Sequence, residues 1–241
     1  MHGNDTLFRQ FFNERKVYKF SKIIFVSNES KIDFMDYYPA LSYKCLVCNN
    51  LVDYNQILDL SSENIDEEKS SSKILLNVGR HDEHQKKLSR LINVCKRLVS
   101  DGFNFKLWLI GDGPDHKQYL DQIEELGLQE YIQVLVPKSN PYPYYKNADA
   151  FVMTSDYEGF PVVYVESMTF GLPIITTIPV SDDSLNINNY AMIVEKDEES
   201  IYNAVKQFLC NGFTIKEKFN PEEFNRNILS KLEKLFDGVN L

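Results

Sequence analysis

The chain has 241 residues, of which 43% are hydrophobic, so it is long enough to bury a sizeable core and to form more than one folding unit. Its formal net charge is −9, and no basic run interleaved with aromatic residues occurs, which argues against nucleic acid as a partner. No apolar stretch approaches the ~20 residues that span a bilayer, and the polar residues Met1 to Asp5 are unlike a signal peptide. We therefore expect a cytoplasmic protein.

Residues 1–58 alternate between helix and strand but are few. A helix is expected over 7–18, a buried strand over 22–27, a second helix over 29–38 and a last strand over 44–50. A domain usually holds ~100–150 residues, so this segment is too short to form a doubly wound domain of its own. Residues 59–72 follow as a polar, charged linker that we expect to be mobile.

Four cysteines occur in the chain, at Cys45, Cys48, Cys95 and Cys210. The Cys45-x-x-Cys48 spacing also occurs in zinc and redox sites, but no second pair or Cys/His cluster accompanies it. On a strand these two residues would face opposite sides. The sequence therefore predicts reduced thiols and no metal site.

Residues 73–210 alternate regularly between strands and helices. Strands are expected over 74–78, 105–110, 132–136, 149–153, 173–177 and 191–194, and helices over 85–100, 115–127, 142–147, 161–170 and 198–210. This alternation predicts an α/β domain with a Rossmann-like, doubly wound parallel sheet that carries helices on both faces.

Residues 211–241 contain a last predicted helix over 221–236, with Phe224 and Ile228 on its apolar face. The sequence leaves open whether this face packs on residues 1–50, lies on the sheet domain or stays partly exposed. An amphipathic membrane helix fits less well, because several acidic residues lie close to that face.

Two basic residues follow the strand predicted over 74–78. Arg80 stands at the carboxyl end of this strand, and Lys86 lies near the start of the next helix. Ligands of doubly wound sheets bind in the crevice at that edge. Two such residues alone would be ordinary surface charge, so their interpretation depends on what else lies at the same edge.

Two carboxylates, Glu158 and Glu166, frame the start of the helix predicted over 161–170. Pro161 suits the first helical turn, so Glu158 lies in the preceding loop and Glu166 about a turn and a half inside. Free N–H groups and the macrodipole make such a helix start attractive to a phosphate. An arbitrary pair of glutamates would be surface residues, but the flanking motif and the basic pair favour a ligand site.

The segment Glu158-Gly159-Phe160-Pro161-Val162-Val163-Tyr164-Val165-Glu166 resembles the E-x7-E signature of retaining glycosyltransferases of the GT-B fold, specifically family 4. The resemblance extends from about Ser21 to the C-terminus. It implies that residues 73–210 are the donor-binding C-terminal domain and that residues 1–58 are a partial remnant of the N-terminal, acceptor-binding domain. Residues 211–241 would then be the helix that crosses back onto that domain.

The resemblance also implies roles for single residues. In the family the first glutamate contacts the donor sugar and the second binds the ribose, and these roles fall to Glu158 and Glu166. The Arg and Lys that neutralise the leaving diphosphate correspond to Arg80 and Lys86. The phosphate is expected to bind at Gly159, Phe160, Pro161 and Val162, through the amides around Phe160 and Val162.

No catalytic role is assigned to several other positions. The family usually has a glycine where this chain has Lys87, and its turn at Gly111-Asp112-Gly113 is a tight structural turn. The loop over 134–140 would lie against the nucleotide base and contact it through the main chain. Three histidines, His81, His84 and His116, are expected to be surface residues.

The function implied is transfer of a sugar from a nucleoside-diphosphate sugar to a hydroxyl of a saccharide or lipid-linked saccharide, with retention. The family commonly does this in cell-surface polysaccharide synthesis, in the cytoplasm or at the inner face of the membrane. No metal and no cofactor is expected, because Arg80 and Lys86 supply the positive charge. Two alternatives stay open: a non-enzymatic nucleotide-sugar-binding subunit that pairs with a separate acceptor-binding chain through aromatic residues near the N-terminus, and an inactive remnant.

Overall fold

The computed structural model describes residues 14–65, 72–135, 137, 139–180 and 185–236. The chain divides into two compact units, one of residues 1–50 with 228–241 and one of residues 51–227. Among the described residues, no helix is both long and apolar enough to cross a bilayer.

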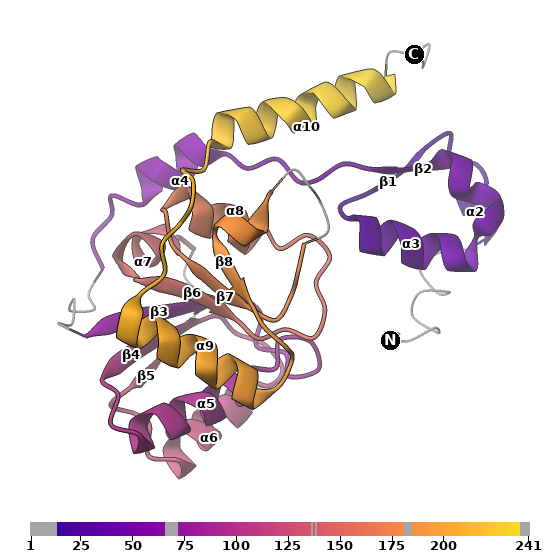
Figure 1. Cartoon of the computed structure of the whole chain (residues 1–241). Helices are drawn as coiled ribbons and strands as arrows, with labels where there is room; N and C mark the ends of the chain where they lie inside the picture. Colours follow the sequence, from indigo (N-terminus) through magenta and orange to yellow (C-terminus); the bar gives the residue numbers. More distant parts are fainter. Residues whose placement is uncertain (1–13, 66–71, 136, 138, 181–184, 237–241) are drawn as a thin grey trace. The chain divides into compact units, whose positions relative to one another are not determined.

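The larger unit is built on a six-stranded parallel sheet (Figure 1). Its strands are β3 (Lys73–Val78), β4 (Phe105–Ile110), β5 (Ile132–Leu135), β6 (Ala150–Met153), β7 (Ile174–Thr176) and β8 (Ala191–Ile193). They lie in the order β5-β4-β3-β6-β7-β8, which is the doubly wound order of a Rossmann-like fold. The predicted fold class is confirmed, and the central strands are buried on both faces, as expected of a parallel sheet.

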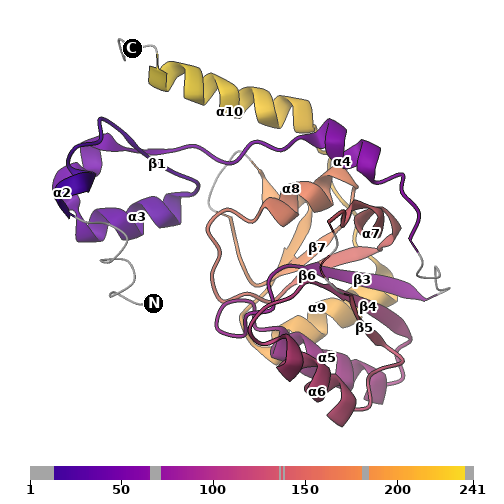
Figure 2. The same ribbon diagram turned by 180° about the vertical axis from the view of Figure 1, so that it is seen from behind.

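Helices cover both faces of this sheet (Figures 1 and 2). One face carries α5 (Leu88–Ser100), α6 (His116–Glu125) and α9 (Glu198–Asn211), and the other carries α4 (Tyr54–Leu60), α7 (Tyr142–Asn147) and α8 (Val162–Thr169). The apolar residues of α5 that recur at helical spacing, such as Leu91 and Cys95, are fully buried against the sheet. Helix α5 begins at Leu88 and not at residue 85, because Lys87 before it adopts a left-handed conformation.

The winding of the sheet reverses between β3 and β6. These two strands pair at Leu75 with Ala150 and at Leu76 with Phe151, and the buried Asn77 amide donates to the Val152 carbonyl at 2.8 Å. Because the chain leaves β3 and β6 towards opposite faces of the sheet, the loops that follow them border a crevice at the carboxyl ends. The loops that carry Arg80, Lys86 and Glu158 are these two loops.

The smaller unit contains a two-stranded parallel sheet. Its elements up to residue 50 are α2 (Glu14–Val17), β1 (Ile23–Phe25), α3 (Asn28–Tyr37), a 3-10 helix (Pro39–Lys44) and β2 (Cys45–Val47). The predicted order of helix, strand, helix and strand is confirmed for the described residues, and residues 7–13 of the first predicted helix lie outside them. A small core is formed by Val17, Phe34, Tyr38, Leu41 and Cys45.

The four cysteines are free thiols in the structure, as the sequence predicts. Cys45, Cys48 and Cys95 are buried, whereas Cys210 is exposed. Burial raises the pKa of the Cys45, Cys48 and Cys95 thiols, so these groups are neutral.

The division into units falls at other residues than the predicted boundaries at 58, 72 and 210. Helix α4 was not predicted. It is capped by Asp53, whose Oδ1 accepts from the Gln56 amide at 3.0 Å, and it packs on α7 and α8 within the larger unit. Residues 66–71 of the predicted linker lie outside the described residues.

Helix α10 (Pro221–Phe236) has the predicted bounds and starts in the larger unit. The Asn225 side chain there both accepts from the Val52 amide at 3.2 Å and donates to the Val52 carbonyl at 2.7 Å. The sequence left open whether this helix packs on residues 1–50, packs on the sheet domain or stays partly exposed. Its first turns pack on the sheet domain.

The Gly111-Asp112-Gly113 turn has the structural role that was predicted for it. A Cβ at Gly111 would lie 1.9 Å from the Gly79 carbonyl oxygen, and a Cβ at Gly113 would lie 2.3 Å from that of His81. The His81 amide in turn donates to the Asp112 carbonyl at 2.9 Å. The loops after β3 and β4 therefore touch backbone to backbone, and only glycine fits between them.

We expect Gly111→Ala to destabilise the protein by about 4 kcal/mol or to prevent folding, because the added methyl group meets backbone that cannot move aside. The matched control is Gly127→Ala, at a glycine with φ of 65° and no atom within 4 Å of the added Cβ. That control should cost only about 1 kcal/mol. Urea unfolding of both variants measures the difference, and equal losses would contradict the close contact.

Candidate functional site

Glu158 is the centre of a polar cluster in the loop after β6. Its Oε1 lies 2.6 Å from the Lys86 Nζ and accepts from the Ser155 hydroxyl at 2.7 Å. Its Oε2 accepts from the Gln85 side-chain amide at 3.2 Å. The Glu158 side chain is only 10% exposed and that of Lys86 17%, so this ion pair is largely shielded from solvent. The structure thus brings together two of the predicted site residues, from the loops on either side of the crevice.

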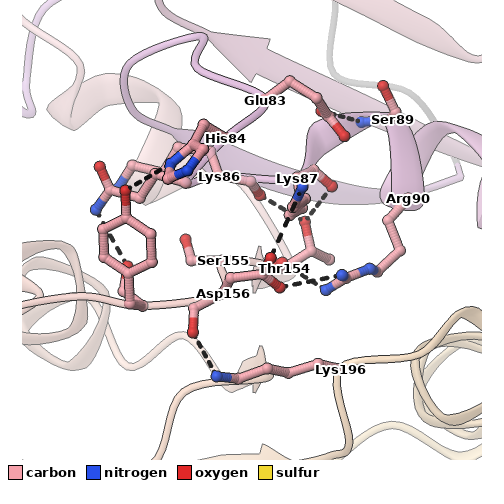
Figure 3. A network of polar contacts seen from close by, with 12 residues as sticks. Glu83, His84, Lys86, Lys87, Ser89, Arg90, Thr154, Ser155, Asp156 and Lys196 are labelled. Atoms are coloured by element: carbon pink, nitrogen blue, oxygen red, sulfur yellow. Dashed lines mark hydrogen bonds and ion pairs between the residues drawn. The ribbon is translucent and has the colours of Figure 1, made fainter. Parts of the chain in front are cut away.

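The two neighbouring lysines point to different partners. Lys86 reaches Glu158, whereas the Lys87 Nζ lies 3.8 Å from the Asp156 Oδ2, a contact drawn in Figure 3. Lys87 has φ of 52° and ψ of 43°, a left-handed conformation that favours glycine. The backbone here therefore keeps the shape that a glycine would allow, and it directs Lys86 alone towards the glutamate.

Backbone contacts hold the two loops together in the same region. The Thr154 hydroxyl bonds to the carbonyls of Lys86 and Lys87 at 3.2 and 3.1 Å, and the Asp156 amide donates to the Gln85 carbonyl at 2.8 Å. Figure 3 shows the Thr154 contacts beside Ser155 and Asp156. These contacts fix the spacing between the lysine-bearing loop and the glutamate-bearing loop.

Two further basic residues contact Asp156 at the edge of the cluster. The Arg90 Nη2 lies 3.0 Å from the Asp156 Oδ1, and Lys196 donates to the Asp156 carbonyl (Figure 3). With Lys86 and Lys87, four cationic side chains lie at this sheet edge near the carboxylates of Asp156 and Glu158, and the same loop also carries Asp82 and Glu83. The edge therefore offers cationic partners to an anionic ligand among carboxylates in similar number.

Arg80 lies apart from this cluster. It follows the carboxyl end of β3, and its side chain is exposed. Within the part of the chain that the structure describes, it forms no ion pair. The structure therefore places Arg80 on the predicted sheet edge, where it forms no ion pair with Glu158 or any other carboxylate of the described residues.

Glu166 occupies a different environment on α8. Its Oε2 accepts from the hydroxyl of the buried Tyr145 at 2.7 Å, and Tyr142 lies near the same carboxylate. Burial raises the pKa of the Glu166 carboxyl, and the two tyrosines oppose that rise. The two glutamates of the predicted motif are thus held by separate sets of partners.

The helix start between the glutamates is open at its N-terminus. Pro161 precedes the first residue of α8, Val162, and no side chain of the described residues caps this end. Gly159 is exposed, while Phe160 is buried and stacks on Phe224 of α10, with ring centroids 6.4 Å apart. The Tyr164 amide donates to the Pro161 carbonyl at 2.9 Å, which leaves the amides before it in the first turn of α8 for an anion.

Sequence reasoning missed the residues that hold the two glutamates. Ser155 and Gln85 are close in sequence to predicted site residues but carry no motif of their own, and Tyr142 and Tyr145 lie on a separate helix. The only available signal was the i, i+3 spacing of the two tyrosines, which places both on one side of a helix.

The expectation that His81 is a surface residue was wrong. Its side chain is fully buried under the β4–α6 loop, and its Nδ1 lies 2.9 Å from the Nδ1 of His116, whose ring stacks on it. His84 is exposed, as predicted, and bonds to the Tyr157 hydroxyl at 2.9 Å (Figure 3). Burial lowers the pKa of His81 to about 4, so this imidazole is neutral at physiological pH.

The described residues contain no group of three or more His, Cys, Asp or Glu side chains arranged to hold a metal ion. The site is instead a doubly wound sheet whose switch point carries a lysine–glutamate pair, a second, tyrosine-bound glutamate and an open helix start. Such a site is suited to a ligand that combines phosphates with hydroxyl groups.

Comparison with known proteins agrees with this description. The family model for glycosyl transferases group 1 matches residues 61–234, and the chain belongs to this family. An uncharacterised glycosyltransferase of Methanocaldococcus jannaschii is 30% identical over 66% of this chain and 40% of its own length. An N-acetylgalactosamine-N,N'-diacetylbacillosaminyl-diphospho-undecaprenol 4-alpha-N-acetylgalactosaminyltransferase of Campylobacter jejuni is 29% identical over 73% of this chain and 47% of its own length. The chain thus spans less than half of these relatives.

Solved structures show the same fold. A glycosyltransferase of Rickettsia africae superposes with a TM-score of 0.74 at 18% identity, over 98% of this chain and 68% of its own. TarM of S. aureus, in a complex that includes UDP, gives a TM-score of 0.68 at 18% identity, over 94% of this chain and 46% of its own. The fold is that of the GT-B glycosyltransferases.

The buried His81 makes stability depend on pH. Its pKa of about 4 in the folded chain lies below the usual 6.5, so between these pH values the unfolded chain binds more protons. Stability contributed by His81 is therefore present above pH 6.5 and is lost as the pH falls towards 4. Between pH 7 and pH 5 we expect this loss to be about 2 kcal/mol.

The variant His81→Asn isolates this contribution, because asparagine can still hydrogen-bond to His116 but does not titrate. Urea unfolding at pH 7 and pH 5 should show a smaller acid-induced loss in the variant than in the wild type. Parallel pH profiles for the two proteins would contradict the assignment to His81.

Proposed function

We propose that this chain is the donor-binding portion of a retaining glycosyltransferase, which transfers a sugar from a nucleoside-diphosphate sugar to a hydroxyl acceptor. The observation that carries the proposal is the shielded Lys86–Glu158 pair at 2.6 Å beside the uncapped start of α8. A cation, a carboxylate and free amides at one switch point match the parts of such a donor: a diphosphate and a polyhydroxylated sugar.

The roles of the residues follow from their chemistry. Lys86, with Arg80 from the same loop, neutralises the charge that develops on the leaving diphosphate, so no metal is required. Glu158 accepts hydrogen bonds from the hydroxyls of the donor sugar and fixes its orientation. When the donor binds, Lys86 turns from Glu158 to the phosphate, while Ser155 and Gln85 continue to hold the glutamate.

The remaining contacts concern the nucleotide. The Glu166 carboxylate binds the ribose hydroxyls, and the amides around Phe160 and Val162 meet a phosphate oxygen. Two related structures support a nucleotide ligand, because TarM and the HepE protein of Anabaena are both complexed with UDP. HepE shares a TM-score of 0.69 and 16% identity with this chain, over 89% of this chain and 64% of its own.

The acceptor class is proposed from the relatives. The Campylobacter relative is named for a diphospho-undecaprenol substrate, and others are named for amylovoran and lipopolysaccharide core biosynthesis. We accordingly assign this chain a saccharide or lipid-linked saccharide acceptor in cell-surface polysaccharide synthesis, in the cytoplasm or at the inner face of the membrane.

A second candidate function is that of a nucleotide-sugar-binding subunit that pairs with a separate acceptor-binding chain. It is kept because the chain spans less than half the length of these curated relatives. Such a subunit alone binds donor without turnover, whereas a self-sufficient enzyme releases sugar from it.

Calorimetric titration with UDP, GDP, ADP and dTDP tests the donor site. We expect one of these to bind, and Lys86→Ala and Glu166→Ala each to weaken binding at least ~10-fold, because each removes a charged hydrogen-bond partner. The matched control is Lys87→Ala, which removes the neighbouring lysine directed at Asp156 and should change the affinity less than ~2-fold. Arg80→Ala shows whether the exposed arginine also contributes.

Two results would argue against the proposal. Equal losses in Lys86→Ala and Lys87→Ala would indicate non-specific attraction of an anion to the basic edge of the sheet. A folded wild-type chain that binds none of the four nucleotides would support the inactive remnant. If a nucleotide does bind, incubation with the matching nucleotide sugars separates the enzyme from the binding subunit by release of the diphosphate.

A further inference from the structure

Two tyrosines of α7 converge on Glu166 from beneath α8. Tyr145 is fully buried, and its hydroxyl donates to the Glu166 Oε2 at 2.7 Å, while Tyr142, one helical turn earlier, lies near the same carboxylate. The third tyrosine of this helix, Tyr144, packs edge-on against Trp108, with ring centroids 5.4 Å apart. Residues 142 and 145 are thus the tyrosines that lie next to Glu166.

Aromatic packing on both sides fixes the Tyr145 hydroxyl. The Tyr145 ring stacks on Phe151 of β6 at 5.8 Å and on Phe170 after α8 at 6.0 Å, with interplanar angles of 9° and 22°. Close packing of a fully buried ring against two others restricts its movement, so its hydroxyl stays at the carboxylate.

Burial raises the pKa of Tyr145 well above its usual value, with the nearby Glu166 charge adding to the rise. The tyrosine is therefore a neutral donor at physiological pH. The Tyr145 hydroxyl occupies one of the roughly four lone-pair positions of the carboxylate, so other positions remain for a ligand. Tyr142 lies near the same carboxylate and acts on it electrostatically, which gives the group a second tyrosine neighbour on one side.

We propose that Tyr145 and Tyr142 are positioning residues that hold the Glu166 carboxylate in the orientation needed for bidentate binding of the ribose 2′- and 3′-hydroxyls. This inference rests on the proposed function and assigns residues of α7 to the same site. A purely structural explanation is weaker, because burying a carboxylate with two tyrosines costs stability that an apolar side chain at position 166 would not.

The test compares ribose recognition with overall affinity. Dissociation constants are measured for UDP, GDP and ADP and for the 2′,3′-dideoxy form of each, with the wild type, Tyr145→Phe and Tyr142→Phe. For the nucleotide that binds, we expect the wild type to prefer the ribose form by about 10-fold. Both variants should lose most of this preference while binding the dideoxy form as the wild type does.

The matched control is Tyr202→Phe. Tyr202 is also a buried tyrosine that donates to a carboxylate, that of Asp101, but it lies on α9 across the sheet. This variant loses a comparable hydrogen bond and should keep the full ribose preference. Tyr142 is less buried than Tyr145. The ratio of ribose to dideoxyribose affinity can therefore be measured with Tyr142→Phe even if Tyr145→Phe does not fold.

Three other results would contradict the positioning role of the tyrosines, the role of Glu166 or the proposed function. If the wild type binds a diphosphate and the tyrosine variants keep its ribose preference, or weaken both forms equally, the positioning role is wrong and the donor site stands. If the wild type binds a diphosphate with no preference for ribose, the role given to Glu166 fails together with that of the tyrosines. If no diphosphate binds, the proposed function fails and this inference with it.

Discussion

The reversal of winding between β3 and β6 is the constraint on which the site depends. Two adjacent parallel strands send the chain to opposite faces of the sheet, so the backbone leaves an opening above their carboxyl ends. The Asn77 amide, bonded to the Val152 carbonyl, ties these strands together just below that opening. Lys86 and Glu158 meet there although 72 residues separate them, and the contacts of Thr154 keep their loops at a fixed distance.

The two glutamates of one short motif are stabilised in opposite ways. Glu158 is paired with a lysine, a partner that an incoming anion can compete for. Glu166 accepts a hydrogen bond from the neutral Tyr145 hydroxyl, which orients the carboxylate without cancelling its charge. Glu158 can therefore lose its partner to an anion, whereas the partner of Glu166 does not respond to one.

The loop after β4 packs closely against the loop after β3. Gly111 and Gly113 let the β4–α6 loop lie directly on the loop that carries Arg80, and the buried His81 fills the space below. Lys87 adopts the left-handed backbone conformation that glycine would adopt without strain. Its carbonyl is held by the Thr154 hydroxyl from the loop after β6. The path of the chain is therefore set by the packing of loops as much as by the identity of each residue.

The sequence by itself determined the alternation of strands and helices, the fold class and the place of Arg80, Lys86, Glu158 and Glu166 at strand ends and helix starts, because hydrophobic periodicity and turn residues are local signals. Only the tertiary structure decided which of these side chains meet. It paired Lys86 with Glu158, left Arg80 apart, buried His81 and brought the α7 tyrosines under Glu166. Contacts between distant elements depend on how helices and loops pack across a sheet, and no spacing along the chain encodes that packing.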